Sequence, residues 1–437
     1  MEPIRVGLLG IGTVGGGTFR VLARNQEEIT RRAGRGIRIT MVADTDVARA
    51  RSIVGDAAVV TSDAFEVVRH PAIDIVVELI GGTSVAKELQ LAALANGKHV
   101  VTANKHLLAK HGNEIFAAAR ERDLMVGFEA AVAGGIPIIK SLREGLTANR
   151  IEWIAGIING TSNFILSEMR DKGLGFSEVL AEAQRLGYAE ADPTFDIEGV
   201  DAAHKLTIMS AIAFGVPMQF ERAYTEGISQ LTQLDISYAE AFGYRIKLLG
   251  ITRRTAAGIE LRVHPALVPA KRLIANVEGV MNAVMVKGDA VGVTMYYGAG
   301  AGAEPTASAV VADLVDVTRM HTADPEHRVP HLAFQPDQLA DTPILPISEV
   351  VTANYLRMRV VDRPGVLADI TRILSDEQVS IDAMLQKEPE EGQDQVDIIL
   401  LTHPTKEAAM QAAIGRIEAL AAVLSKVTKI RLEALRA

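Results

Sequence analysis

A glycine-rich loop between a predicted strand and a predicted helix constrains the fold of this chain more than any other feature. The stretch GLLGIGTVGGG has the spacing G-x-G-x-x-G at Gly10, Gly12 and Gly15, directly after the apolar run IRVGLLG. Glycines at these positions let the backbone turn tightly, so that a pyrophosphate can approach the N-terminus of the next helix. Because the order is strand, loop and helix, the sequence predicts a dinucleotide site that includes Thr13 and Val14.

Strands and helices alternate over the first third of the chain. The runs IRITMVAD, AIDIVVELIG and HVVTAN predict strands, and residues 13–34 predict one long helix. This alternation predicts a parallel, Rossmann-like α/β sheet over residues 1–135. Asp44 ends the second strand, where an acid would bond a ribose hydroxyl, which favours NAD. Arg49 and Arg51 leave NADP open, although their more ordinary place is along their own helix.

The rest of the chain predicts two further domains. Residues 136–302 combine strands and helices in an α+β domain with an open sheet, and a helix after Pro305 completes the first domain over about 303–325. A linker rich in proline and acid follows. Residues 350–437 predict the order βαββαβ, a ferredoxin-like module.

Composition and charge exclude several classes of protein. The chain has 437 residues, of which 48% are hydrophobic, and a net charge of −9 without a long basic run. Nucleic acid and anionic membranes are therefore poor partners, and no apolar run is long enough to span a bilayer. With no cysteine, aldehyde oxidation through a thioester is excluded. A chain that begins directly in a strand predicts no signal peptide, and we expect a cytoplasmic protein.

The best candidate for catalysis is an acidic segment, residues 190–201, together with Lys205 just after it. Asp201 and Lys205 are four residues apart on a predicted helix and share one face. Taken by themselves, these residues favour a solvated acidic loop with a surface ion pair. A bound dinucleotide implies hydride transfer, however, so some group must handle the proton on the substrate oxygen. Lys105 is a second candidate because it follows the C-terminal end of a strand, whereas we interpret His204 and His264 as structural.

The residues quoted so far, with several others, resemble one family nearly from end to end. The segments are VGLLGIGTVGGG, VVELIGGT, GKHVVTANKHLLA, FEAAVAGGIPII, NGTSNFIL, LGYAEADPTFDIEGVDAAHK and YYGAGAGAEPTASAVVAD. Together they are similar to the homoserine dehydrogenases. The resemblance implies oxidation of L-homoserine by NAD(P)+ to L-aspartate 4-semialdehyde, and the reverse, in threonine, methionine and isoleucine biosynthesis.

The resemblance also implies roles for individual residues. Lys205 would donate and accept the proton. The groups around the amino acid would be Asp201, Asp196, Glu190, Tyr188 and Lys105, with Gly160 and Thr161 lining the pocket and Gly187 and Gly302 near the nicotinamide. These residue types fit the substrate, because its ammonium needs acids and its carboxylate needs a base.

A monovalent cation site is a further implication of the resemblance. Glu129 would supply a carboxylate, and Val132, Gly134 and Ile136 would supply backbone carbonyls to Na⁺ or K⁺. All-oxygen ligation of this kind suits a hard cation of low charge.

The C-terminal module resembles an ACT domain, in which Asp362 and Gly365 lie at the turn where small amino acids bind. L-threonine is the expected effector, and a purely structural dimerising module is the alternative. The resemblance implies a monofunctional enzyme that forms a homodimer or homotetramer through its middle domain. Two other functions remain open: another NAD(P)-linked oxidoreductase of small polar substrates, or an amino-acid sensor without catalysis.

Overall fold

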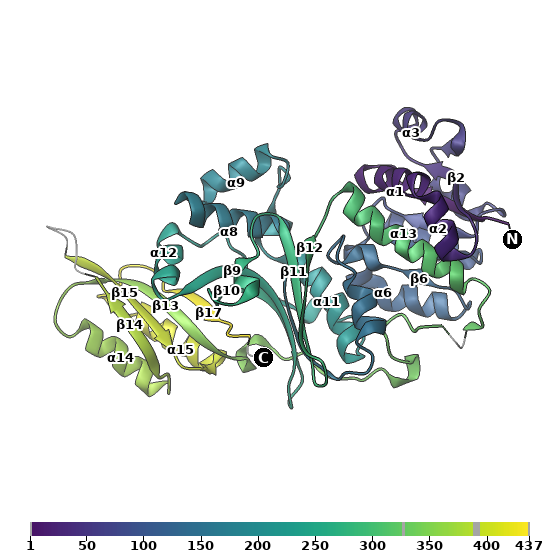
Figure 1. The fold of residues 1–437 in the computed structure, drawn as a ribbon. Coiled ribbons are helices and arrows are strands. Elements are labelled where there is room, and N and C mark those ends of the chain that lie inside the picture. Colours follow the sequence, from purple (N-terminus) through teal and green to yellow (C-terminus); the bar gives the residue numbers. More distant parts are fainter. Residues whose placement is uncertain (1, 326–327, 388–393, 436–437) are drawn as a thin grey trace. The chain divides into compact units, whose positions relative to one another are not determined.

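The computed structural model describes residues 2–325, 328–387 and 394–435, which fold into two compact units (Figure 1). The first unit consists of Met1–Gly160, Asp201–Ala223 and Val280–Thr342. The second consists of Thr161–Val200, Tyr224–Gly279 and Pro343–Ala437. Each unit therefore combines segments that are far apart in the sequence. The predicted Rossmann-like sheet, the separate mixed sheet and the C-terminal module are all present.

The first unit contains a six-stranded parallel sheet in the order β3-β2-β1-β4-β5-β6. Its strands are β1 (Ile4–Leu9), β2 (Ile37–Ala43), β3 (Val59–Thr61), β4 (Ile75–Glu78), β5 (His99–Thr102) and β6 (Val126–Gly127). The short β3 was missed in the sequence. This is the strand order of dinucleotide-binding folds, in which the ligand crosses the sheet edge between the first and fourth strands.

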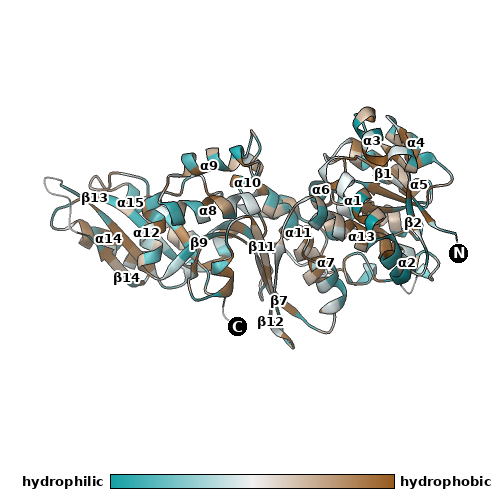
Figure 2. Ribbon diagram, turned by 45° about the horizontal axis from the view of Figure 1, so that its top comes forward, coloured by the Kyte–Doolittle hydropathy of each residue, from teal (hydrophilic) through white to brown (hydrophobic). Residues whose placement is uncertain are grey.

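Helices cover this sheet. They are α1 (Thr13–Arg24), α2 (Gln26–Ala33), α3 (Val47–Val54), α4 (Ala64–Arg69), α5 (Val85–Ala95), α6 (Lys105–Arg120) and the short α7 (Ile138–Lys140). The single helix expected over residues 13–34 is wrong, because Asn25 leaves helical geometry with φ −105° and ψ 19°. Asparagine favours such breaks, since its short side chain competes for backbone hydrogen bonds. The helix after the break, α2, is hydrophilic and is teal in Figure 2.

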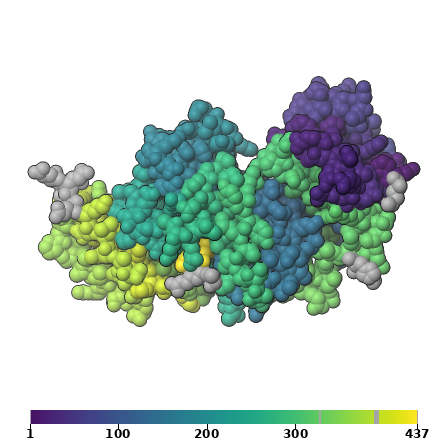
Figure 3. Space-filling view, in the orientation of Figure 1, coloured from purple at the N-terminus to yellow at the C-terminus, as the bar shows by residue number. Residues whose placement is uncertain are grey.

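A late helix, α13 (Ala303–Met320), packs on the N-terminal α1. A Cβ added at Gly17 would lie 2.4 Å from the carbonyl oxygen of Ala303, so glycine allows the close approach. Ala307, Val310 and Leu314 are fully buried in the core that both helices share. In the space-filling view the green atoms of this late segment lie beside the purple N-terminal ones (Figure 3).

The first unit also contains β7 (Ile151–Ile157), β11 (Met281–Gly288) and β12 (Gly292–Ala299), paired antiparallel. A largely buried helix, α11 (Val200–Phe214), carries Asp201 and Lys205. None of the helices among the described residues combines the length and the apolar character that a membrane crossing requires.

In the second unit the main path of the sheet has six strands, in the order β9-β10-β17-β13-β15-β14. They are β9 (Tyr244–Arg254), β10 (Ile259–Pro269), β13 (Val351–Val361), β14 (Ile381–Gln386), β15 (Gln395–Thr402) and β17 (Thr428–Leu432). The short β8 (Tyr224–Thr225) pairs with β10, and β16 (Thr405–Lys406) pairs with β13. The helices are α8 (Gly160–Lys172), α9 (Phe176–Arg185), α10 (Thr194–Ile197), α12 (Gln233–Ala241), α14 (Val366–Asp376) and α15 (Glu407–Glu418).

The C-terminal module has the predicted order βαββαβ, with β16 as a short addition before α15. Figure 1 shows α14 and α15 on the same side of its strands, and the two helices contact each other. Its last strand, β17, lies between β13 of the module and β10 of the preceding domain. The module therefore shares one sheet with that domain within the second unit.

Candidate functional site

The glycine loop lies at the carboxyl edge of the parallel sheet, between β1 and α1. Gly10 has φ +87°, which favours glycine, and a Cβ at Gly15 would lie 2.1 Å from the Gly10 carbonyl oxygen. A Cβ at Gly12 would meet only Arg49, at 3.9 Å, so the space above Gly12 is open. No side chain caps the N-terminus of α1, so its first amides can bind an anion.

Asp44 and Arg49 both bind the backbone of this loop. The Ile11 amide donates to Asp44 Oδ2 at 2.7 Å, and the Asp46 amide donates to Asp44 Oδ1 at 2.9 Å. Arg49 Nη2 donates to the Ile11 carbonyl at 3.3 Å. Asp44 thus lies where the sequence predicted, but Arg49 reaches the loop instead of lying along its own helix.

A buried carboxylate that the sequence analysis missed shapes the next loop along this edge. Glu78 ends β4 with none of its surface exposed. Its oxygens accept hydrogen bonds from the amides of Ile80 and Gly81, at 2.9 and 3.0 Å, and from Thr102 Oγ1 at 2.9 Å. The apolar run VVELIGGT gave one signal, a lone acid at the end of a buried strand. Glu78 fixes the turn that faces the glycine loop across β1 and β4.

Three segments of the first unit bring a cluster of charged groups together around Asp201. Lys205 Nζ donates to Asp201 Oδ2 at 2.7 Å, and Lys105 Nζ lies 3.2 Å from Asp201 Oδ1. Asn159, which follows β7 and was not predicted, donates from Nδ2 to Asp201 Oδ2 at 3.0 Å. Lys105 starts α6 after β5, so both predicted lysines meet the same carboxylate.

The lysines determine the charge of this carboxylate. Burial alone would raise the pKa of Asp201, but the positive charges of Lys205 and Lys105, together with hydrogen bonds from Lys205 and Asn159, hold it well below its usual range. Asp201 is therefore ionised at neutral pH. Lys205 Nζ also donates to the Ile158 carbonyl at 2.8 Å. The Lys205 side chain is 11% exposed and that of Lys105 is 39% exposed, so both lysines keep contact with solvent.

His204 lies next to Lys205 in sequence but points to a ring cluster. Its ring stacks on His106 with centroids 4.6 Å apart and tilts against Phe220 at 4.3 Å. Burial and the neighbouring His106 lower the pKa of His204 to about 3. His264 is fully buried in β10, and its Nδ1 lies 2.8 Å from the Pro265 carbonyl oxygen. Both histidines thus occupy structural positions.

Four of the residues expected around the amino acid, Thr161, Tyr188, Glu190 and Asp196, lie in the second unit. Thr161 Oγ1 donates to the Tyr188 carbonyl at 2.6 Å, and Ser162 Oγ donates to the Asp196 carbonyl at 2.9 Å. Helix α8 thus holds the backbone at Tyr188 and Asp196, on either side of Glu190. Glu190 is exposed and Asp196 is partly exposed.

The three glycines expected to approach ligands differ in their surroundings. Gly160 is constrained by packing, since a Cβ there would lie 2.7 Å from the Val280 carbonyl oxygen. Gly187 follows α9 with φ +77° and open space around it. Gly302 precedes α13 with φ +133°, a backbone conformation that side chains disfavour.

The segment expected to bind a cation forms a buried turn. Glu129 is 5% exposed, and its two oxygens accept the amides of Ile139 and Lys140 at 2.9 and 2.8 Å. Burial raises the pKa of Glu129 despite these bonds. Within the described part of the chain, the buried carbonyls of Val132 and Gly134 accept no hydrogen bond, whereas Ile136 accepts the Ile138 amide. Buried carbonyls without donors beside a buried acid fit a small cation.

In the C-terminal module, Asp362 and Gly365 lie at the turn between β13 and α14, as the sequence predicted. Both are exposed, and Gly365 begins α14 with φ +97°. The Asp362 amide donates to the Asp394 carbonyl at 2.7 Å.

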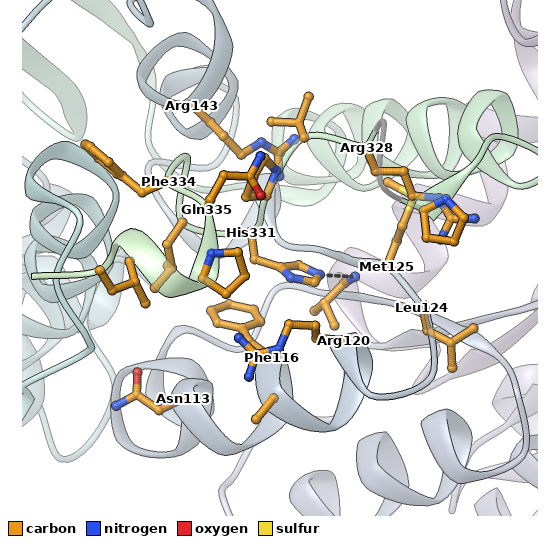
Figure 4. Close-up of a pocket in the computed structure, with 18 of the residues that line it drawn as sticks. Asn113, Phe116, Arg120, Leu124, Met125, Arg143, Arg328, His331, Phe334 and Gln335 are labelled. Carbon is orange, nitrogen blue, oxygen red and sulfur yellow. Dashed lines mark hydrogen bonds between the residues drawn. The ribbon is translucent and has the colours of Figure 1, made fainter.

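A cavity of about 550 Å³ lies elsewhere in the first unit, between α6 and residues 328–339 (Figure 4). The lysine cluster does not contribute to its lining. Its polar groups hold the fold: His331 accepts the Val126 amide at 3.1 Å, and Arg328 donates to the Asp123 carbonyl at 2.6 Å. We therefore do not assign the reaction to this cavity.

Comparison with known families accounts for most of the chain. Residues 10–129 match the sequence model described as "Homoserine dehydrogenase, NAD binding domain". Residues 137–315 match the model described as "Homoserine dehydrogenase", and residues 354–422 match the ACT domain.

Individual relatives agree with these matches. A homoserine dehydrogenase of Pseudomonas aeruginosa is 63% identical over 437 residues and covers 100% of both chains. A crystal structure of a homoserine dehydrogenase from Thiobacillus denitrificans has 73% identity and a TM-score of 0.96, covering 100% of this chain and 99% of its own. A hyperthermophilic archaeal homoserine dehydrogenase mutant in complex with NADPH has 26% identity and a TM-score of 0.62, covering 72% of this chain and 98% of its own.

Proposed function

The chain belongs to the homoserine dehydrogenase family, and we propose that Lys205 moves the proton that accompanies hydride transfer between L-homoserine and L-aspartate 4-semialdehyde. The enzyme is an NAD(P)-dependent oxidoreductase that acts on a CH–OH group. When bound, NAD(P) accepts or supplies the hydride at its nicotinamide ring. The chain itself must position the substrate and handle the proton on the substrate oxygen.

The observation that carries this proposal is the hydrogen bonding of Lys205. An ammonium group has three N–H donors. Two of them are used by Asp201 Oδ2 and the Ile158 carbonyl, at 2.7 and 2.8 Å. These are its two acceptors within residues 2–325, 328–387 and 394–435, so the third donor can bind the oxygen of the substrate. In the reducing direction Lys205 donates this proton to the carbonyl oxygen as the O–H bond forms, and in the oxidising direction the neutral amine takes it back.

Asp201 holds the proton carrier in place. It accepts hydrogen bonds from Lys205 and from Asn159 Nδ2, the latter at 3.0 Å, and forms an ion pair with Lys105, so its position is fixed from three sides. Because the carboxylate stays ionised, its negative charge attracts the Lys205 side chain and keeps its nitrogen in place. Lys105 is the more exposed lysine, and we assign it to the carboxylate of the amino acid.

The acidic segment provides the complementary charge for the substrate ammonium group. We assign this contact to Glu190, which is exposed, and Asp196, which is partly exposed. We also assign Tyr188, Thr161 and Gly160 to binding of the amino acid. Binding of the substrate ammonium group by these acids would discriminate against malate, which carries no ammonium group.

We assign the nucleotide to the carboxyl edge of the parallel sheet. The open space at Gly12 and the uncapped amides of α1, from Thr13 through Gly15, suit the pyrophosphate. Asp44 and Arg49 lie beside the loop where the adenosine ribose would bind, and they suit NAD and NADP respectively. We assign Gly187 and Gly302 to the nicotinamide end.

A monovalent cation, Na⁺ or K⁺, is proposed at the turn of residues 129–136. Glu129 and the carbonyls of Val132, Gly134 and Ile136 would hold it, and its charge would compensate the buried carboxylate. Its role would be to order the turn that precedes α7.

Regulation and assembly are also part of the proposal. The turn with Asp362 and Gly365 is the proposed site for L-threonine, the expected feedback effector of threonine biosynthesis. A homodimer or homotetramer and a cytoplasmic location stay predictions.

The proposed reaction is tested by the absorbance of the nicotinamide ring at alkaline pH. We expect reduction of NAD⁺ or NADP⁺ with L-homoserine, and none with L-serine, L-threonine or malate. The cofactors are supplied separately, with sodium or potassium present. A folded protein that reduces neither cofactor would contradict the proposal and favour the amino-acid sensor.

A further inference from the structure

We propose that Arg431, on the last strand of the C-terminal module, is a positioning residue for the acidic segment of the substrate site. The inference rests on the proposed role of that segment in binding the amino acid. Arg431 is fully buried, yet it lies more than two hundred residues away from the segment in sequence. Arg431, the acidic segment up to Gly199 and the residues that connect them all lie within the second unit.

Arg431 connects the C-terminal module to a short stretch after β8. Its Nη2 and Nε donate to Glu407 Oε1 and Oε2 at 2.8 and 3.2 Å, which anchors β17 to the start of α15. Its Nη1 donates to Glu226 Oε2 at 2.7 Å. Tyr224 OH donates to the same Glu226 oxygen at 2.9 Å, and its ring lies 5.2 Å from the guanidinium carbon. The bidentate contact with the buried Glu407 fixes the guanidinium group, and its remaining nitrogen holds Glu226.

The residues that follow Glu226 contact Ile197 and Glu198 of the acidic segment. The Ile228 amide donates to the Ile197 carbonyl at 2.8 Å, and Ser229 Oγ donates to Glu198 Oε1 at 2.7 Å. At Gly227 a Cβ would lie 2.3 Å from Glu198 Oε2 and 2.6 Å from the Ile197 carbonyl oxygen. The backbone of this stretch is therefore pressed against α10 without room for a side chain.

Strand β10 contacts both Glu226 and the acidic segment. The Glu226 amide donates to the Val263 carbonyl of β10 at 2.8 Å. Gly199, near the end of the acidic segment, has φ +78°, and a Cβ there would lie 3.0 Å from Val263 Cγ1. The segment between Asp196 and Gly199 thus depends on Glu226, and the placement of Glu226 depends on Arg431.

The chain offers a matched control for this connection. Arg357, on β13 of the same module, also forms a buried ion pair with the preceding domain: its Nε donates to Asp235 Oδ1 at 2.6 Å. Asp235 belongs to α12, which does not carry the acidic segment. Breaking the Arg357 pair should therefore disturb the link between module and domain without moving the substrate site.

The test compares Arg431→Lys and Glu226→Gln with Arg357→Lys in the full-length protein. We expect the KM for L-homoserine to rise about tenfold in the first two, which corresponds to about 1.4 kcal/mol. Their KM for the nucleotide and their kcat should stay near the wild-type values. Arg357→Lys should leave all three constants unchanged, while its Tm falls as in Arg431→Lys.

A double variant separates positioning from general destabilisation. If Arg431 acts through Glu226, the KM of Arg431→Lys/Glu226→Gln should not exceed that of the more affected single variant. Additive effects, an unchanged homoserine KM, or an equal rise in the nucleotide KM would overturn the inference. If Arg431→Lys does not fold, Glu226→Gln decides, because it leaves the Arg431–Glu407 contact intact. Inactive wild-type protein would instead contradict the proposed function itself.

Discussion

Two buried lysines, one in each unit, differ in whether all of their hydrogens are used. Lys205 has two acceptors among the described residues, Asp201 and the Ile158 carbonyl. Lys247, on β9, has three: the Val277 carbonyl at 2.6 Å, Asn163 Oδ1 at 3.2 Å and Glu278 Oε2 at 3.4 Å. An ammonium group has three donors, so only Lys205 has one left for a ligand.

The surroundings of the two lysines differ in the same sense. Lys247 is 1% exposed, and burial lowers its pKa to about 8 although Glu278 opposes the shift. Lys205 keeps contact with solvent and lies beside a second lysine, Lys105, that shares its carboxylate. A buried lysine with complete hydrogen bonding stabilises a fold, whereas one with a spare donor can do chemistry. Residue type and burial alone would not separate them.

Removing each lysine should give opposite results, and this is the largest effect we expect. Lys205→Ala should lower kcat by about 10²–10⁴, the usual contribution of a general acid or base. Its affinity for the nucleotide should be unchanged. Lys247→Met should keep turnover and lose stability, since Glu278, Asn163 and the Val277 carbonyl each lose one donor. Steady-state kinetics and nucleotide titration measure both, and near-normal turnover of Lys205→Ala would remove it from the mechanism.

The stability contributed by Lys247 should depend on pH. Between pH 8 and 10.5 the unfolded chain holds a proton that folded Lys247 has released, so the free energy of unfolding rises with pH. The slope is up to about 1.4 kcal/mol per pH unit. Denaturant titrations of wild type and Lys247→Met should therefore diverge as the pH rises from 8 to 10. A constant difference between them would mean that the folded protein does not depress this pKa.

A smaller effect is expected at Arg49, which contrasts with both lysines because it is exposed. Its contact with the Ile11 carbonyl, at 3.3 Å, puts a positive charge beside the glycine loop. Arg49→Ala should lower kcat/KM for NADP⁺ by about tenfold, as expected when an arginine that binds a 2′-phosphate is lost. The value for NAD⁺ should change little, and Arg51→Ala serves as the control. Equal losses with both cofactors would contradict a role in phosphate recognition.

The sequence predicted those parts of the molecule that depend on local spacing. The tight turn before α1 was predicted from the spacing of Gly10, Gly12 and Gly15, because glycines at these positions let the backbone turn tightly. Asp201 and Lys205 were predicted to pair because residues four apart share one face of a helix. The βαββαβ order of the C-terminal module followed from the alternation of its strands and helices.

Other features depend on contacts between distant segments. Asn159 and the Ile158 carbonyl reach the lysine cluster only after β7 and α11 pack together, and no periodicity signals this. Lys247 lies in the apolar strand run IKLLGITRR. The pattern of this run does not indicate that the lysine has three hydrogen-bond acceptors. The pairing of β17 with β10 puts Arg431 beside Glu226. Strand neighbours of this kind are set by topology and not by local sequence.

Chemical rescue would test the role of the Lys205 ammonium most directly. Lys205→Ala leaves a space beside Asp201 and the Ile158 carbonyl that a small primary amine can enter. We expect methylamine or ethylamine to restore homoserine oxidation by Lys205→Ala in proportion to the amine concentration, and to leave Lys247→Met and wild type unchanged. If no amine restores turnover while the variant is folded and binds nucleotide, another group carries the proton and the proposed role of Lys205 is wrong.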